Sequence, residues 1–395
     1  MKLPGNLGHL TYCLNIHATQ TFDDVQAALD GPVAAVKSAV SPDAPFAVGL
    51  RFSGEALDEL ADPAKRAGLK TQLEAHDFQG LTVNGFPYGR FHGTRVKEEV
   101  YQPDWRSDER VRYTNVLADL MAEIAPSGEF VSLSTVPGTF KPLSAGAEAL
   151  MAENYLQSVA HLIRLRERTG VTVALAIEPE PSCFLETIAE TVDYFRDHLF
   201  SAAAASRISQ LTGLTPAQSA EALPRHLGLC YDVCHAAVEY EDPADSITAL
   251  RDAGIPVHKL QLSAALRVIS VGAEQRAALA DFDEPTYLHQ VIRRTPEGMK
   301  STVDLPEALA LGAATDGEEW RVHFHVPVFI DDLGAFSSTR NFLQDILALH
   351  RQNPISPHLE IETYTWDVLP VDLRGESVDQ DITREMHWVL EQLTA

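Results

Sequence analysis

Cysteine is scarce in this sequence, with four residues (Cys13, Cys183, Cys230 and Cys234) in a chain of 395. So few cysteines in so long a chain do not form the disulfide framework of a small secreted protein. Cys230 and Cys234 lie four positions apart, but the chain has no second cysteine pair that would complete a structural zinc site. We therefore expect reduced thiols in the core, as in cytoplasmic proteins.

Long apolar runs and basic residues are also in short supply. No segment approaches the roughly 20 apolar residues of a membrane-spanning helix, and the first six residues lack the apolar segment of a signal peptide. The 31 Lys and Arg residues are outnumbered by 56 Asp and Glu residues, which gives a formal net charge of −25. A surface this acidic repels phosphate backbones and anionic lipids. The sequence predicts a cytoplasmic protein that binds a small molecule, with no nucleic-acid partner and no membrane span.

Nine strand-like runs alternate with amphipathic helical stretches along the chain. This alternation predicts an α/β fold, a (β/α)8 TIM barrel formed by residues 1–395 as a single domain. Because such a barrel has eight strands, one run is surplus or belongs to an insertion. The nine runs are residues 10–16, 46–52, 81–86, 130–136, 171–177, 227–231, 257–262, 322–329 and 359–363.

Two long segments interrupt the alternation. Residues 201–225, after the fifth run, predict an extra helical pair, and residues 267–319, after the seventh run, predict an insertion with a β-hairpin and a short helix. Residues 84–104 are rich in Gly, Pro and aromatic residues and predict an ordered loop over the barrel mouth.

Several runs end in side chains that ligate metals. Because side chains alternate along a strand, Glu178, Asp232 and Glu362 each fall on the inner face at the carboxyl end of a run. Glu360 shares that face with Glu362, and two carboxylates there are too costly to bury unpaired. A divalent cation between the carboxylates removes that cost. The alternative is that these acids cap helices or pair with Arg and Lys, which we favour for Glu180.

Polar side chains on two further runs are candidates for the same site. His323 and His325 share one face of residues 322–326, and His325 lies nearer the end, so we predict it as a metal ligand. Lys259 and Gln261 share the inner face of residues 257–262. Gln261 either ligates the metal weakly through its amide oxygen or holds substrate, and an edge strand with a wet face explains both residues nearly as well.

At these residues the chain resembles the xylose-isomerase-like superfamily of sugar (phosphate) isomerases, epimerases and endonuclease-IV-type hydrolases. The resemblance rests on Glu178-Pro179, Asp232-x-x-His235, a later His and Glu362. Four segments more closely resemble the EboE-type metabolite traffic proteins, which are implicated in moving or processing precursors of secondary metabolites. These segments are residues 84–93 (NGFPYGRFHG), 231–238 (YDVCHAAV), 323–327 (HFHVP) and 362–366 (ETYTW).

The resemblance implies roles for individual residues. Glu178, Asp232 and Glu362 fall on three metal-ligand positions, and the two glutamates also fall on the catalytic, proton-shuttling positions. His235 falls on a substrate-contacting position; His323, Asn84 and Lys259 are our further candidates for contacting substrate. The chain has Gln261 where an epimerase has its ligand His. Either the insertion returns a histidine, such as His325, to the same place, or the metal site is weakened.

Three functions stay open on the sequence. The first is a divalent-metal-dependent isomerase or epimerase of a sugar-like or polyol-like metabolite. The second is a non-catalytic carrier of a metabolite, and the third is a metal-dependent hydrolase, which needs several metal ions and more histidines. Carboxylate ligands suit Mn²⁺ or Mg²⁺, whereas imidazoles move the preference toward Zn²⁺, Fe²⁺ or Co²⁺. Protein partners encoded in the same gene cluster and a homodimer are compatible with the resemblance.

Overall fold

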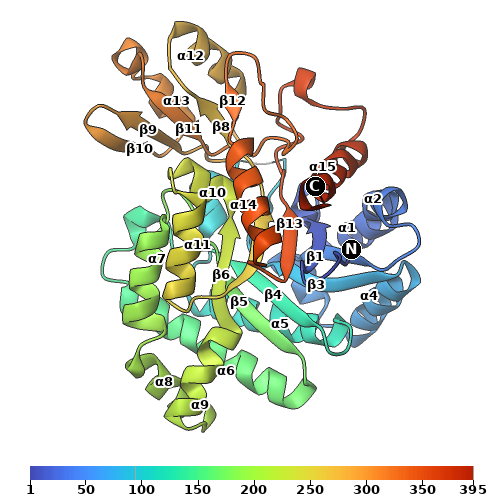
Figure 1. Ribbon diagram of the computed structural model, residues 1–395. Coiled ribbons are helices and arrows are strands. Elements are labelled where there is room, and N and C mark those ends of the chain that lie inside the picture. Colours follow the sequence, from blue (N-terminus) through green and yellow to red (C-terminus); the bar gives the residue numbers. More distant parts are fainter. Residues whose placement is uncertain (94, 395) are drawn as a thin grey trace.

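Eight parallel strands form a barrel at the centre of the molecule (Figure 1). The computed structural model describes residues 1–93 and 95–394. Neighbouring strands follow the order β1-β13-β7-β6-β5-β4-β3-β2, and a parallel bridge between Cys13 and Gly49 joins β1 to β2. The predicted (β/α)8 barrel is thus confirmed. The strands are β1 (His9–Tyr12), β2 (Phe46–Arg51), β3 (Phe78–Asn84), β4 (Phe130–Thr135), β5 (Thr172–Ile177), β6 (Leu227–Asp232), β7 (Val257–Leu262) and β13 (His358–Ile361).

Helices cover the outside of the barrel because each has an apolar stripe that packs on the strands. Side chains at the helix starts set where several of them begin: Thr21 and Thr187 each form a reciprocal capping box with an acid three residues later. The longest helix, α6 (Glu148–Thr169), ends at Gly170, whose φ of 76° suits a residue without a Cβ. The other outer helices are α1 (Phe22–Ala28), α2 (Ala34–Val40), α3 (Gly54–Glu59), α4 (Pro63–Ala75), α5 (Asp108–Ile124), α7 (Ile188–Tyr194), α10 (Val233–Val238), α11 (Pro243–Asp252), α14 (Arg340–Gln352) and α15 (Val378–Thr394).

Short helical turns punctuate the connections. They are η1 (Leu14–Ile16), η2 (Leu29–Val33), η3 (Lys97–Tyr101), η4 (Lys141–Leu143), η5 (Phe195–Leu199), η6 (Ala280–Phe282), η7 (Gly312–Thr315) and η8 (Val371–Leu373). Of these, η3 bears on function because it lies in the predicted mouth loop and carries Tyr101 into the cavity described below.

The insertion after the fifth barrel strand is the predicted helical pair, α8 (Ala202–Thr212) and α9 (Pro216–His226). Ser201 and Thr215 accept hydrogen bonds from the first turns of these helices. The pair lies at the end of the barrel opposite to the second sheet (Figure 1). It therefore contributes nothing to the barrel mouth.

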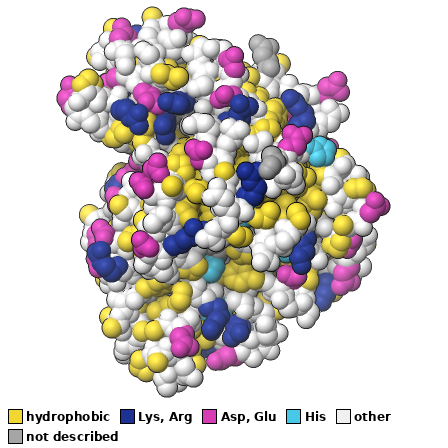
Figure 2. Space-filling view, in the orientation of Figure 1, with side chains coloured by type: hydrophobic (Ala, Val, Ile, Leu, Met, Phe, Trp, Pro, Cys, Tyr) yellow, Lys and Arg dark blue, Asp and Glu magenta, His cyan; other side chains and the backbone are white. Residues whose placement is uncertain are grey.

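The insertion after the seventh strand builds a second, five-stranded sheet in the order β10-β9-β11-β8-β12. Its pairs are antiparallel, and β9 with β10 is the predicted hairpin. Arg side chains gather with Asp and Glu over this sheet (Figure 2), where Arg293 pairs with Glu318 and Arg294 pairs with Glu319. The elements are β8 (Leu266–Val268), α12 (Ala273–Leu279), β9 (Val291–Thr295), β10 (Gly298–Thr302), α13 (Leu305–Leu309), β11 (Glu319–Val322) and β12 (Ser337–Ser338).

The predicted barrel strand at residues 322–329 is wrong, and it is the surplus run. Strand β11 ends at Val322 in the second sheet, and residues 323–328 form no strand. The segment alternates because it runs between the two sheets: Phe324, Val326 and Val328 are fully buried against apolar neighbours. Two of its backbone N–H groups donate hydrogen bonds in opposite directions. His323 N donates to Gln290 O, just before β9 (2.8 Å), and Val326 N donates to Ala264 O, just after β7 (2.9 Å).

The barrel interior is polar beneath its mouth. Lys259 of β7 and Glu360 of β13 form an ion pair (2.8 Å) in which both side chains have no exposed surface. Space for Glu360 comes from Gly49, where an added Cβ would lie 2.0 Å from the Glu360 carboxylate. TIM barrels are usually filled with branched apolar side chains, so this buried pair departs from the usual filling.

None of the helices in the described ranges, 1–93 and 95–394, combines the length and the apolarity needed to cross a bilayer.

Candidate metal centre

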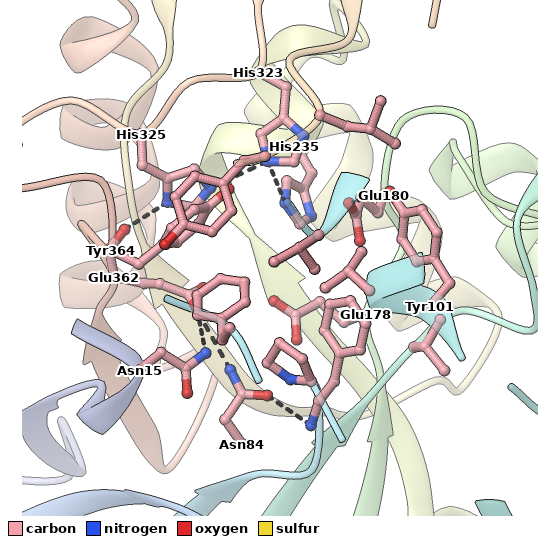
Figure 3. A pocket seen from close by; sticks show the side chains of 18 of the residues that line it. Asn15, Asn84, Tyr101, Glu178, Glu180, His235, His323, His325, Glu362 and Tyr364 are labelled. Carbon is pink, nitrogen blue, oxygen red and sulfur yellow. Dashed lines mark hydrogen bonds between the residues drawn. The ribbon is translucent and has the colours of Figure 1, made fainter. Parts of the chain in front are cut away.

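A cavity opens at the carboxyl ends of the barrel strands, and most of the predicted site residues line it (Figure 3). The volume that water centres can occupy in the cavity is about 50 Å³, and the empty space between its lining side chains, open mouth included, is about 600 Å³. Glu178 and Glu362 face the same space, with three histidines above them and Asn15 and Asn84 below them in the view of Figure 3. This end of the barrel is where TIM-barrel enzymes place their chemistry.

Three acids from three strand ends converge beside the cavity: Glu178 and Glu362 line it, and Asp232 lies next to them outside the lining. Glu178 follows β5, Asp232 ends β6 and Glu362 follows β13, and one carboxylate oxygen of each lies within 4.8 Å of the others. We call these residues the carboxylate group. They are 2–6% exposed. Backbone bonds that continue the strand ladders hold two of them, from Glu178 N to Thr135 O and from Glu362 N to Leu262 O (3.1 Å each).

The carboxylate group concentrates negative charge away from water. Burial, and then the neighbouring Asp232, raises the pKa of Glu178 to about 7. Burial, and then Glu178 and Asp232, raises the pKa of Glu362 well above its ordinary value. The nearby Lys259 is already paired with Glu360. Buried like charges at this distance favour either a shared proton or a cation.

Asp232 differs from the two glutamates. Burial alone would raise the pKa of Asp232, but His235, His325 and the Ser263 hydroxyl together hold it below its ordinary value. Ser263 Oγ donates to Asp232 Oδ1 (2.6 Å), and so does the backbone N–H of His235 (3.1 Å). Asp232 is therefore the acid of the group that most strongly retains its charge.

Amide side chains orient Glu362. Asn15 and Asn84 donate to Glu362 Oε1 (3.3 Å each), and Gln261 Nε2 donates to Glu362 Oε2 (2.9 Å). Gln261 is fully buried beside the group and lies outside the cavity lining. Its amide oxygen has no hydrogen-bond partner among the described residues, and neither do Glu178 Oε2 and Asp232 Oδ2. Orphaned buried oxygens beside three acids are the donor set that a divalent cation satisfies.

Three histidines form a second cluster beside the first, and we call them the imidazole group. His235 lies in the first turn of α10, directly after β6, whereas His323 and His325 come from the segment that returns from the second sheet. Each ring is held through Nδ1 by an oxygen acceptor: Pro179 O for His235, Gln290 Oε1 for His323 and Glu362 O for His325. The acceptors place a proton on each Nδ1 and leave an electron pair on each Nε2.

His323 Nε2 lies close to the Nε2 atoms of both other histidines. His323 Nε2 lies 3.1 Å from His235 Nε2 and 3.3 Å from His325 Nε2. Nearby carboxylates offset the effect of burial and raise the pKa of His235, so a proton on His235 can satisfy the first contact. Burial lowers the pKa of His325 to about 4, which leaves the second contact without a proton. A tetrahedral zinc ion spaces its ligand nitrogens by about 3.3 Å, so the imidazole group also fits a cation.

Asp232 links the two groups, since one of its oxygens lies within 4.8 Å of the ring nitrogens of His235 and His325. His325 therefore lies next to the predicted acids, but it comes from the segment after β11 and not from a barrel strand. An imidazole therefore reaches this place from a part of the chain distant from β7.

We expected Glu180 to cap a helix or to pair with Arg or Lys at the rim. The structure places it in the cavity wall instead. It is 7% exposed and lines the cavity, and Tyr101 donates to its Oε1 (2.7 Å). Glu180 also groups with His235 and His323 within 4.8 Å. Reasoning from strand alternation missed it because Pro179 ends the strand, and only its closeness to Glu178 in the sequence marks it.

Lys259, a predicted substrate contact, lies beneath the carboxylate group and not in the cavity lining. Its ammonium group is satisfied by Glu360 (2.8 Å) and Ser134 (3.4 Å). The remaining predicted substrate contacts, Asn84, His235 and His323, do line the cavity.

Solved structures resemble this arrangement of strands and helices, although no family model and no curated protein sequence matches the chain. A xylose isomerase-like TIM barrel protein from Mycobacterium smegmatis, in complex with magnesium, is 11% identical with a TM-score of 0.52, covering 98% of this chain and 97% of that one. A D-tagatose 3-epimerase-like protein is 12% identical (TM-score 0.47; 91% and 95% covered). The IOLI protein with a zinc atom is also 12% identical (TM-score 0.48; 98% and 99% covered).

At such low identity, the Mycobacterium smegmatis structure supports a conclusion about architecture alone. The chain has the fold of the xylose isomerase-like TIM barrel proteins.

Proposed function

We propose that this protein is a divalent-metal-dependent isomerase or epimerase of a small molecule with adjacent carbonyl and hydroxyl oxygens. One observation carries the proposal: Glu178, Asp232 and Glu362, from three separate strands, hold carboxylate oxygens within 4.8 Å of one another while almost fully buried. Without a cation, the desolvation and mutual repulsion of these carboxylates destabilise the folded protein.

Glu178, Asp232, Glu362 and His325 would hold the ion, with Gln261 orienting Glu362. Carboxylate-rich ligation suits Mn²⁺ or Mg²⁺, and magnesium is what the similarly folded Mycobacterium smegmatis protein binds. The imidazole of His325 moves the preference toward Zn²⁺, Fe²⁺ or Co²⁺.

The chemistry needs a base and an acid on the two sides of a substrate carbon. When bound, a divalent ion polarises neighbouring carbonyl and hydroxyl oxygens and so acidifies the C–H bond between them. Glu178, whose pKa is raised to about 7, is suited to take up a proton near neutral pH. Glu362, held by Asn15, Asn84 and Gln261, would return a proton from another strand end.

Solvent exchange tests the proposal. Purified protein is first analysed for bound metal, and small α-hydroxyketones are then followed in D₂O by NMR. We expect exchange of the carbon-bound proton, and a loss of about 100-fold or more in Glu178→Gln and Glu362→Gln, the scale of acid–base catalysis. Glu239→Gln is the matched control, because it changes a partly buried glutamate outside the cavity. Exchange retained in both site variants would exclude the assigned roles.

A second candidate, metal-dependent hydrolysis, is favoured by the imidazole group. Hydrolases of this kind use two or more ions to hold the attacking and leaving oxygens, and the nitrogen spacings of 3.1 and 3.3 Å suit a second ion. This candidate predicts two ions per chain, falling toward one in His323→Ala. A single ion per chain in the unmodified protein, saturated with metal, would remove it.

The relationship to EboE-type proteins is also a proposal. It is supported by the position of the four segments that carry the resemblance, since each contributes to the one cavity: Phe91, His235, His325 and Tyr364 come from one segment each. We further propose that the second sheet belongs to the barrel domain. Tyr240, just after α10, donates to Glu319 O (3.0 Å) in support of this view.

A further inference from the structure

The cavity has two chemically different ends. Its inner end holds the carboxylate and imidazole groups, whereas its outer walls present carbon. The lining side chains without any polar atom that lie beyond the strand ends include Phe86, Phe91, Val96, Val100 and Leu288. The apolar outer lining would contact the part of the substrate that does not react.

No free cation faces the cavity from its described lining. Lys97 is the one basic side chain other than histidine among the lining residues, and its ammonium group pairs with Asp304 (2.6 Å) and donates to Glu284 O (3.3 Å). Arg51 lies behind the wall and donates to Thr19 O (2.7 Å) and Pro87 O (3.2 Å). Apart from the imidazole group and the ion proposed above, a phosphate or carboxylate entering the cavity would meet the acids Glu178, Glu180 and Glu362 and no unpaired Lys or Arg.

Two hydroxyl groups in the aromatic walls are already engaged. Tyr101 donates to Glu180 and accepts from Gln290 Nε2 (3.0 Å), and Tyr287 Oη bonds to His92 Nδ1 (2.9 Å). A body covered with hydroxyls would lose its water here with few partners in return, which weakens binding.

Aromatic faces offer contact area instead. Phe91, Tyr287 and Tyr364 pack with ring centroids 4.9–5.2 Å apart on one side of the cavity. On another side Phe86 and Tyr101 stack with centroids 5.9 Å apart and planes within 9°. Such walls favour an apolar or planar group over a hydrated one.

We propose that the substrate is uncharged and joins a pair of adjacent oxygens to an apolar, preferably planar, body. The oxygen pair rests on the function proposed above; the apolar body rests on the outer walls alone. This excludes sugar phosphates and disfavours free sugars as natural substrates of the site.

Three α-hydroxyketones with the same reactive head test the proposal. They are 2-hydroxyacetophenone, dihydroxyacetone and dihydroxyacetone phosphate, each titrated into the protein saturated with Mn²⁺, with proton exchange followed in parallel. We expect 2-hydroxyacetophenone to bind about tenfold or more tightly than dihydroxyacetone, because its ring leaves water. The phosphate should add no affinity. Tightest binding of dihydroxyacetone phosphate, or equal binding of all three ketones, would overturn the proposal.

A wall variant locates the effect. Phe91→Ala should weaken binding of 2-hydroxyacetophenone about fivefold or more, while dihydroxyacetone binding and metal content stay unchanged. Phe200→Ala is the matched control, because this partly buried aromatic residue packs against Phe195 outside the cavity. Equal losses of affinity for 2-hydroxyacetophenone in the Phe91→Ala and Phe200→Ala variants would contradict a role for the aromatic wall in binding.

The two proposals fail separately. Exchange that follows the opposite order of ketones keeps the isomerase proposal and overturns the apolar body. Binding in the expected order without any exchange supports the apolar body and contradicts the isomerase proposal. Failure of all three ketones to bind at millimolar concentration would overturn both.

Discussion

The carboxylate and imidazole groups lie side by side but are built in different ways. Glu178, Asp232 and Glu362 extend from barrel strands, whose parallel ladders fix where each acid ends. Two of the three histidines, His323 and His325, lie instead on an irregular segment that returns from the second sheet. The barrel thus places carboxylates at set positions, and the segment that returns from the second sheet brings imidazole nitrogens beside them.

The groups also differ in what holds them when no ion is present. The acids repel one another, and burial raises the pKa of Glu178 and Glu362. The imidazoles are neutral or share a single proton, and each is held by a bond from Nδ1 to an oxygen. The carboxylate group should therefore depend more strongly on the charge around it.

Removing the charge beneath the carboxylate group should have the largest effect. Lys259→Met leaves Glu360 buried without its partner, and breaking such a pair costs about 3–5 kcal/mol of unfolding free energy. Urea unfolding measures the loss. The double variant Lys259→Met with Glu360→Leu should recover most of it, because apolar residues can replace a buried pair. A double variant no more stable than the single one would show that the pair is not what stabilises the barrel.

Removing the acid shared by the two groups should come next. Asp232→Ala takes a ligand from both groups and should weaken metal binding about 100-fold or more, whereas His323→Ala should affect only an ion in the imidazole group. Competition against a chelator measures both affinities. Equal losses of affinity for the first ion in Asp232→Ala and His323→Ala would contradict the division into two groups.

An effect confined to part of the pH range should appear at Glu385, which accepts hydrogen bonds from residues near both groups. Its Oε1 accepts from Thr363 Oγ1 (2.6 Å) and from Val328 N (3.1 Å). Burial raises the pKa of Glu385 from about 4.5 to about 8. Because the folded state holds this proton more tightly than the unfolded state, stability should fall as pH rises from about 4.5 to 8.

Glu385→Gln should remove that part of the pH dependence. At pH 8 the variant should be more stable than the unmodified protein by up to about 4 kcal/mol, and at pH 4.5 the two should be nearly equal. Thermal or urea unfolding at both values, with saturating metal, measures the difference. A constant difference between the two pH values would show that Glu385 does not titrate in this range.

The sequence predicted the barrel because strand and helix periodicities alternate clearly, and it pointed to the strand-end acids because alternation fixes the inner face. It assigned residues 322–329 to the barrel because a segment buried on both sides alternates like a strand. The chain alone does not reveal whether such a segment finds ladder partners. Alternation placed Lys259 and Glu360 on inner faces and left pairing of the acids with Lys open, but it could not match these two residues, because their register depends on the closed barrel.

The most direct test is anomalous diffraction from crystals of the metal-saturated protein. The proposed metal centre predicts an ion within about 2.0–2.4 Å of carboxylate oxygens from Glu178, Asp232 and Glu362. An ion that contacts at most one of these acids, or no ion at the barrel mouth, would contradict it.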